Sequence, residues 1–229
     1  MSIRANLDVV HERIARACLK SGRDPAEVTL VAVSKTFPLE RLQAAADQGQ
    51  MVFGENKAQE LDEKATAWTS SDVEWHFIGH LQRNKAPVVA RHADVFHALD
   101  SVRLARALDR RLEEENRTLR CLVQVNVSGE QSKFGLDPSA LAPFLEEVAQ
   151  FERLRIEGLM TLAAPTDDPE HVRPQFSLLR SLLSTPAPGG NTRLRALSMG
   201  MSGDFEVAIE EGATHVRVGS AIFGNRSYQ

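Results

Sequence analysis

The sequence predicts an α/β protein: a single-domain (β/α)8 barrel of the TIM type with one extra N-terminal helix. Eight short apolar runs recur along the 229 residues, and segments with helical spacing separate them. Strands that alternate with helices pair in parallel, because each helix returns the chain to the starting edge of the sheet. Eight such units at this length favour a closed barrel, with an open doubly wound sheet as the alternative. We expect one domain over residues 1–229.

The leading helix is indicated by a single apolar stripe close to the N-terminus. Its residues recur at spacings of four and three: Ile3, Leu7, Val10, Ile14 and Ala17. This is the period of an amphipathic helix, and Gly22 would end it. The helix precedes the first apolar run, so it stands outside the repeating units.

The apolar runs that follow are the expected strands. They are "TLVAVSK" (29–35), "MVFG" (51–54), "WHFIG" (75–79), "VFHAL" (95–99), "CLVQVNV" (121–127), "RIEGLM" (155–160), "LRALSM" (194–199) and "HVRVGS" (215–220). Each is short and is bounded by polar or turn-forming residues, as strands of a barrel are.

Local signals mark the helices between these strands. Asp137 provides an N-cap, and Pro138 suits the first position of a helix. Leucine and valine stripes support two of the helices: Leu104, Leu108 and Leu112 after Ser101, and Leu141, Leu145 and Val148 after Pro138. Gly49 and Gly212 stand where two other helices should end.

The overall composition excludes several classes of partner. The net charge is −4, which gives no indication of a nucleic-acid partner or an anionic membrane surface. Cys18 and Cys121 have neither C-x-x-C nor metal-ligand spacing, so we expect free buried thiols in a reducing compartment. We find neither a signal-peptide core nor a stretch of about 20 apolar residues. The protein is therefore expected to be cytoplasmic.

In barrels of this type, chemistry gathers where the strands end and the following loops begin. In chain order, the expected strand ends carry Lys35, Asn56, His80, Asp100, Asn126, Thr161, Ser198, Gly219 and Ser220. So many small, polar or reactive side chains on one rim indicate a functional site there. Strand-to-helix turns also attract Asn, Ser and Asp as helix caps, so the set does not by itself define the chemistry.

The last two units indicate a phosphate site. "SMGMSGD" (198–204) and "VGSAIFG" (218–224) each lead from a strand into a helix through a turn that contains glycine and serine. Glycine lets backbone N–H groups approach an oxyanion, serine adds a donor, and a helix start adds positive potential. Phosphate sites in these barrels use the loops after strands 7 and 8, which is where both motifs fall. The alternative is two ordinary turns with serine caps.

Lys35 stands at the end of the first expected strand, facing this phosphate site. Alternation places it on the same face as Val31 and Val33, which would fill the barrel interior. A lysine with its stem among valines is partly desolvated, which lowers its pKa and favours the neutral amine that attacks carbonyl groups. The amine and the phosphate site together suggest a phosphorylated aldehyde or ketone: pyridoxal phosphate, or a sugar phosphate in a Schiff-base aldolase.

Arg217 helps to separate these two ligands. His215, Arg217 and Gly219 alternate onto one face of the last expected strand. An arginine that points inward could offer its planar fork to a ring nitrogen. It could equally form a structural ion pair with a barrel carboxylate such as Glu157, and the residues alone leave both interpretations open.

Six motifs follow one another over nearly the whole chain. They are "AVSKT" (32–36), "FGENKAQE" (53–60), "WHFIGHLQRNK" (75–85), "VNVSGEQSKFGL" (125–136), "GLMT" (158–161) and "LSMGMSGDFEVAIEEGATHVRVGSAIFG" (197–224). Together they resemble the pyridoxal phosphate homeostasis protein family, and the last motif is long enough to be highly specific. The resemblance implies an alanine-racemase-like barrel over residues 1–229.

The resemblance also implies a cofactor, pyridoxal 5′-phosphate, held as a Schiff base on Lys35. It implies that Asn56 of "GEN" approaches the cofactor and that Arg217 of "HVRVG" faces the pyridine nitrogen. The implied phosphate contacts are Ser198, Met199 and Gly200 in one turn, and Gly219 and Ser220 in the other. His80 and Lys133 fall in family motifs without a secure role. Position 220 holds serine where the family often has threonine, which keeps the hydroxyl.

The function implied is that of a non-catalytic regulator of cellular vitamin B6 and of amino- and keto-acid balance. We expect a monomer that transiently passes its cofactor to accepting enzymes, with an amino-acid racemase or a Schiff-base aldolase as alternatives. Racemases of the related fold need a tyrosine opposite the lysine, and the only tyrosine here is Tyr228. No metal is expected, because His76 and His80 would lie about 13 Å apart along a strand.

Overall fold

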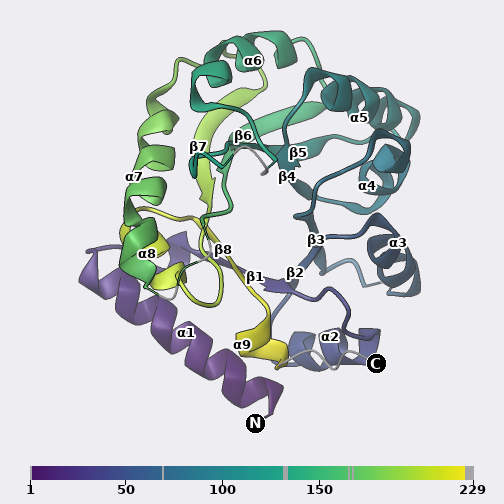
Figure 1. The fold of residues 1–229 in the computed structure, drawn as a ribbon. Helices are drawn as coiled ribbons and strands as arrows, with labels where there is room; N and C mark the ends of the chain where they lie inside the picture. The colour runs from purple at the N-terminus through teal and green to yellow at the C-terminus, as the bar shows by residue number, and fades with distance from the viewer. Residues whose placement is uncertain (1, 69, 131–133, 165, 167, 225–229) are drawn as a thin grey trace.

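The computed structural model describes residues 2–68, 70–130, 134–164, 166 and 168–224. Its strands form one closed parallel barrel in chain order, from β1 (Thr29–Val33) to β8 (His215–Val218) (Figure 1). These two strands pair directly, with Leu30 opposite Val216, and so close the sheet. The predicted (β/α)8 barrel is therefore confirmed, and the open doubly wound sheet is excluded.

The other elements alternate around the barrel. The remaining strands are β2 (Val52–Glu55), β3 (Glu74–Phe77), β4 (Val95–Leu99), β5 (Leu119–Gln124), β6 (Leu154–Met160) and β7 (Thr192–Ser198). The helices are α1 (Ile3–Lys20), α2 (Leu39–Ala46), α3 (Ala58–Ala67), α4 (Ala86–His92), α5 (Val102–Glu114), α6 (Leu141–Val148), α7 (Arg173–Ser181), α8 (Phe205–Glu210) and α9 (Ser220–Phe223). Figure 1 shows the helices as a ring outside the strands. Among the described helices, none combines the length and the apolar character needed to cross a membrane.

The leading helix α1 packs across α8 and α9, and its predicted apolar stripe is buried (Figure 1). Arg13 makes two hydrogen bonds of 2.7 Å to the carboxylate of Glu206 on α8. Its guanidinium carbon also lies 4.4 Å from the centre of the Phe205 ring. Asn6 donates a 2.7 Å hydrogen bond to the carbonyl of Ile222 in α9. The extra helix thus holds in place the two units that carry the last two turns.

The helix predicted from Pro138 begins later than expected. Pro138–Ala140 forms a 3-10 turn, and α6 starts at Leu141. Asp137 still caps the segment by accepting a 2.9 Å hydrogen bond from the N–H of Ser139. The physical reason is a second proline, Pro143, which has no N–H to donate to the carbonyl four residues earlier. A regular first helical turn therefore cannot form.

The barrel has a polar interior and an apolar exterior. Outward-facing strand residues join the helices in one continuous hydrophobic core. Inside, the rings of His76, His97 and His215 on β3, β4 and β8 have their centres 4.9–5.9 Å apart. Val31, opposite Arg217 in the β1–β8 register, points into the same space. Val31, which was expected to face the barrel interior, does so, and Val95 of β4 lies opposite His76 in the register and faces the same way.

Candidate functional site

A cavity of about 520 Å³ opens at the end of the barrel where the strands end. Lys35 and Asn56 reach it from the turns after β1 and β2. Arg217 reaches it from β8, and Gly219 and Ser220 from the turn that follows. Residues that are far apart in the sequence and were each predicted for a site therefore share one cavity.

A buried charged cluster holds the backbone on one side of Lys35. Ser34 is fully buried, and its hydroxyl donates a 2.7 Å hydrogen bond to the carboxylate of Glu55. The ammonium of Lys64 donates to the same carboxylate oxygen at 2.6 Å and to the carbonyl of Ser34 at 2.9 Å. Burial raises the pKa of Glu55, and the charge of Lys64 counteracts that rise. The cluster fixes where β1 ends and where Lys35 begins.

Glu60 holds the other side of Lys35. Its carboxylate accepts a 2.6 Å hydrogen bond from the N–H of Thr36. Burial of Glu60 opposes ionisation, but this hydrogen bond and the charge of Lys64 outweigh it and lower its pKa. Thr36 has a φ of +69°, in the left-handed region that residues other than glycine rarely adopt. The chain therefore turns sharply beyond Lys35, whose half-buried side chain lines the cavity.

Asn56 brings an unsatisfied polar atom to the cavity. The turn that carries it passes close to Gly79, where a Cβ would lie 2.3 Å from the Asn56 carbonyl oxygen. The side-chain oxygen of Asn56 is buried and has no hydrogen-bond partner within the described residues. Such an atom costs about 1–3 kcal/mol. A ligand that donates a hydrogen bond here would remove that penalty.

Arg217 lies deep in the cavity and is 4% exposed. Burial lowers its pKa to about 10, and the charge of Asp204 opposes this. Its two terminal nitrogens donate to the hydroxyl of Ser198 and, at 2.7 Å, to the carbonyl of Thr161. Within the described residues it forms no ion pair, and Glu157 lines a different cavity. The alternative of an Arg217–Glu157 ion pair is therefore not realised.

The turn after β7 contributes residues other than the predicted ones. Ser198 and Met199 are fully buried, and Gly200 forms the turn with a φ of +90°. A Cβ on Gly200 would lie 2.6 Å from the Cβ of Ala208, so only glycine fits there. The residues of this turn that line the cavity are Met201, Ser202 and Gly203. Direct phosphate contacts from Ser198, Met199 and Gly200 stay a prediction.

Ser202 and Gly203 present hydrogen-bond donors to the cavity. Asp204 shapes their turn, because its carboxylate accepts a 2.6 Å hydrogen bond from the N–H of Met201. The N–H groups of Ser202 and Gly203 have no acceptor in the part of the chain that the structure describes. The hydroxyl of Ser220 lies 3.3 Å from that of Ser202, so the turns after β7 and β8 meet. Two hydroxyls beside open N–H groups form a concavity suited to an oxyanion.

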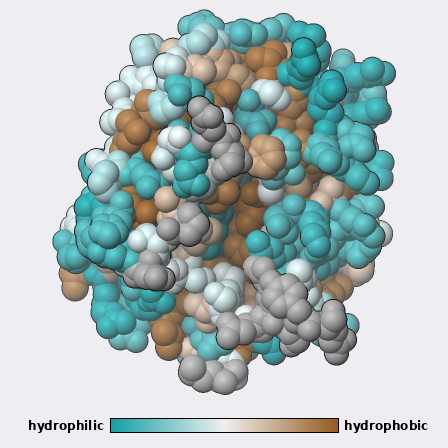
Figure 2. Space-filling view, in the orientation of Figure 1, coloured by the Kyte–Doolittle hydropathy of each residue, from teal (hydrophilic) through white to brown (hydrophobic). Residues whose placement is uncertain are grey.

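The mouth of the cavity is apolar. The rings of His80 and Phe134 stack with their centres 3.9 Å apart and their planes at 13°. Phe134, Leu162 and Met201 line the mouth as exposed hydrophobic side chains. Figure 2 shows hydrophobic surface in the hollow at the middle of this face. Lys133, which was singled out by its motif, lies outside the described residues.

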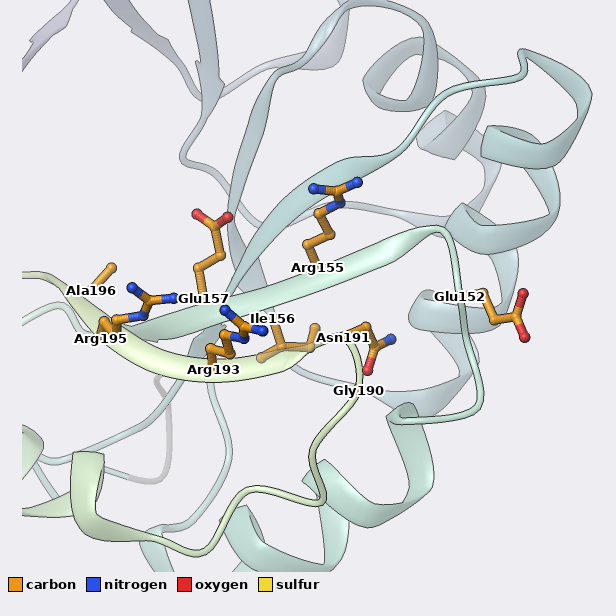
Figure 3. Close-up of a pocket in the computed structure, with 9 residues that line it drawn as sticks. All are labelled: Glu152, Arg155, Ile156, Glu157, Gly190, Asn191, Arg193, Arg195 and Ala196. Atoms are coloured by element: carbon orange, nitrogen blue, oxygen red, sulfur yellow. The ribbon is translucent and has the colours of Figure 1, made fainter.

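A larger cavity of about 760 Å³ lies at the other end of the barrel (Figure 3). Its walls carry Arg155 and Glu157 from β6 and Arg193 and Arg195 from β7, all in the N-terminal or middle parts of these strands. The three arginines are exposed to solvent. Enzymes and binding proteins with this fold use the opposite end of the barrel, where Lys35 and Arg217 lie. The smaller cavity is therefore the candidate site.

Comparisons with known proteins agree with the fold and with the motifs. The alanine racemase N-terminal domain family matches residues 3–227. The pyridoxal phosphate homeostasis protein of Aquifex aeolicus (strain VF5) is 41% identical over 228 residues, which cover all of both chains. That of Escherichia coli (strain K12) is 43% identical over 232 residues, or 99% of this chain and 97% of the relative. The chain belongs to the pyridoxal phosphate homeostasis protein family.

A solved structure supports the same membership. PipY of Synechococcus elongatus PCC7942, solved with pyridoxal phosphate bound, aligns with a TM-score of 0.81 and 37% sequence identity. The alignment covers 94% of this chain and 100% of PipY. The barrel of PipY is therefore preserved over 94% of this chain.

Sequence reasoning missed part of the candidate site of this family member. Ser202 and Gly203 stood in the motif "SMGMSGD", and their position beyond the end of β7 was the available signal. Glu55 and Lys64 gave a weaker signal: a carboxylate in a short strand and a lysine on the helix that follows. Phe134 gave none, because its ring stacks on His80 only after the barrel closes.

The Glu55–Lys64 pair predicts a stability effect that depends on pH. Replacing Lys64 with Met leaves the buried Glu55 carboxylate without its counter-charge, which should lower the free energy of unfolding at pH 7 by about 3–5 kcal/mol. Without Lys64, the pKa of Glu55 in the folded state should rise further above its unfolded value. The folded variant then binds the proton more tightly, so its deficit should shrink between pH 7 and pH 5. Urea unfolding at both pH values measures this.

Lys57→Met is the matched control for this experiment. The side chain of Lys57 is 65% exposed, and its ammonium lies 3.5 Å from Glu60. An exposed pair of this kind contributes at most about 1 kcal/mol. If Lys64→Met and Lys57→Met lowered the free energy of unfolding by equal, small amounts, the buried pair would not be what holds the turn.

Proposed function

We propose that this chain binds pyridoxal 5′-phosphate in the cavity at the strand ends, with Lys35 as the covalent anchor. We further propose that it acts as a non-catalytic carrier in the homeostasis of vitamin B6 and of amino and keto acids. One observation carries the proposal: Lys35, Arg217 and Ser220 line the same cavity. The names of its relatives and the pyridoxal phosphate bound to PipY support the same ligand.

The residues of the cavity fit the chemical groups of this cofactor. The hydroxyls of Ser202 and Ser220 and the open N–H groups beside them suit its phosphate. The unsatisfied side-chain oxygen of Asn56 suits the ring hydroxyl. The buried Arg217 suits the ring nitrogen, because a guanidinium can only donate hydrogen bonds. When bound, the cofactor supplies an aldehyde and an electron-withdrawing ring.

Lys35 would attach the aldehyde through its amine, with loss of one molecule of water. The hydrogen bonds at Ser34 and Thr36 keep its backbone in one place while the side chain reaches the cavity. Arg217 would oppose protonation of the ring nitrogen, because it carries a permanent positive charge. A ring that stays unprotonated is a weak electron sink. The site therefore suits holding a reactive aldehyde more than turning over amino acids.

Attachment to Lys35 can be mapped directly. Purified protein incubated with pyridoxal phosphate should show a visible absorbance band, and borohydride should fix the adduct on the peptide that contains Lys35. The reason is that Lys35 is the lysine that lines the cavity within the described residues. An adduct found mainly on Lys57, Lys85 or Lys133 would refute the assignment, and absence of any band would revive the aldolase alternative.

The serine turns predict selectivity for the phosphorylated vitamer. Charge-assisted hydrogen bonds contribute about 1.5–3 kcal/mol each, so the double variant Ser202→Ala, Ser220→Ala should bind pyridoxal phosphate at least about tenfold more weakly. Pyridoxal, which lacks the phosphate, should bind the wild type and the double variant equally poorly. Fluorescence titration of both vitamers measures this. Similar affinities of the wild type for the two vitamers would show that the phosphate lies elsewhere.

We predict no appreciable racemisation of alanine. Efficient two-base racemisation needs a second base opposite Lys35, and Tyr228, the only tyrosine, lies outside the described residues. His80 is the other titratable base of the described cavity, and its ring is stacked on Phe134. Chiral chromatography of alanine incubated with the cofactor-loaded protein measures the rate. Efficient turnover by the wild type that disappears in Lys35→Ala would contradict the carrier function.

A further inference from the structure

A continuous chain of hydrogen bonds crosses the barrel interior from Arg217 toward the opposite end. Arg217 donates to the hydroxyl of Ser198, which lies 2.8 Å from Nδ1 of His97. Nε2 of His97 lies 2.8 Å from Nδ1 of His76, and Nε2 of His76 lies 2.7 Å from the carboxylate of Glu74. We call these four residues the relay: Ser198, His97, His76 and Glu74. Ser198, His97 and His76 are fully buried.

The two ends of the chain determine the direction of every hydrogen bond. A guanidinium only donates, so the hydroxyl of Ser198 accepts from Arg217. Its own proton is then available for Nδ1 of His97, which is the direction that the Glu74 end requires. His97 must then carry its proton on Nε2 and donate it to Nδ1 of His76. His76 in turn carries its proton on Nε2 and donates to Glu74. Burial lowers the pKa of both histidines, which favours their neutral forms.

The opposite donor–acceptor direction of these hydrogen bonds is excluded by the ionised carboxylate of Glu74. The hydrogen bond from His76, together with the charges around it, lowers the pKa of Glu74 to about 2, so the group is an ionised acceptor. Arg120 donates a further 2.7 Å hydrogen bond to the same carboxylate oxygen. In the reverse order, a bare nitrogen of His76 would face this carboxylate at 2.7 Å, and the two acceptors would repel each other.

We propose that the relay positions Arg217 as a hydrogen-bond donor to the ring nitrogen of bound pyridoxal phosphate. This inference rests on the proposed function. The relay residues do not touch the cofactor; they act through Arg217 and are positioning residues. Because a buried charge is unfavourable unless other groups compensate it, we infer that the ordered dipoles of the relay add to the charge of Asp204 in stabilising the guanidinium.

The geometry explains how this positioning works. The terminal nitrogens of Arg217 are held on the inner side by Ser198 and by the carbonyl of Thr161. A guanidinium has five N–H groups in a rigid fork, so holding two of them sets the direction of the others. Arg217 also lines the cavity, which leaves its remaining donors for a ligand. Loss of the Ser198 hydroxyl would release one side of the fork.

The test compares pyridoxal phosphate with its 1-deaza analogue, in which carbon replaces the ring nitrogen. A hydrogen bond to a charged donor should make the wild type prefer pyridoxal phosphate by about tenfold or more. We expect Ser198→Ala and Arg217→Ala each to reduce this preference to about threefold or less, and the double variant to show no further loss. Dissociation constants by fluorescence titration give the preference as a ratio.

The ratio of the two dissociation constants distinguishes an effect of Ser198 through Arg217 from a direct contact of Ser198 with the phosphate. If Ser198 contacted the phosphate instead, Ser198→Ala would weaken both compounds equally and leave the ratio unchanged, which would overturn the inference. If the wild type bound neither compound, the proposed function would be overturned. The role of the relay toward the cofactor would be overturned with it. Wild type that bound both compounds equally well would overturn the relay alone.

Two further variants distinguish loss of the relay from damage to the fold. Thr192→Val removes another buried hydroxyl from β7, which within the described residues hydrogen-bonds only to its neighbour Asn191, at 3.3 Å. This variant should keep the full preference. Glu74→Gln preserves shape at the far end of the relay but can donate as well as accept, so the direction of the chain is no longer determined. We expect it to lower the preference at least about threefold. An unchanged preference in folded Glu74→Gln would overturn the inference.

Discussion

The positive charge of Arg217, buried inside the barrel, constrains the structure around it. A guanidinium in such a place needs acceptors on every side that faces protein. The structure supplies the hydroxyl of Ser198 and the carbonyl of Thr161, while the carbonyl of Gly200 accepts from the Arg217 backbone N–H at 3.0 Å. Beyond Ser198, the chain of hydrogen bonds runs through the two histidines, His97 and His76, to Glu74. The acceptors around Arg217 thus account for part of the polar interior.

The apolar core is separate from this polar interior. It lies between the outer faces of the strands and the helices, and it holds the barrel together without involving the site. The site depends on a few polar side-chain groups that stabilise the turns at the strand ends of that scaffold. One is the Glu55–Lys64 pair beneath Lys35, and another is the Asp204 carboxylate that shapes the turn at Ser202. Each places a cavity residue by holding the backbone next to it.

These groups help to place the lysine, the candidate oxyanion site and the arginine in one cavity. Under the proposed function, these three groups would hold the cofactor at three points, and an arginine at its ring would not promote carbanion chemistry. The same family domain occurs in alanine racemases, so the barrel itself does not decide between holding and turnover. We propose that the acid–base groups around the lysine decide between the two.

The sequence alone determined the alternation of strands and helices, the closure into a barrel and the side of the barrel where Lys35, Asn56, Arg217, Gly219 and Ser220 meet. These features follow from local periodicity and from the rule that parallel strands end at one rim. It named Ser198 and not Ser202, which lines the cavity, because which serine of a turn faces the cavity depends on how Gly200 packs against Ala208. Nor did it reveal that His76 and His97, 21 residues apart, share a hydrogen bond. Only the register of neighbouring strands brings such side chains together, and that register is set by closure of the whole barrel.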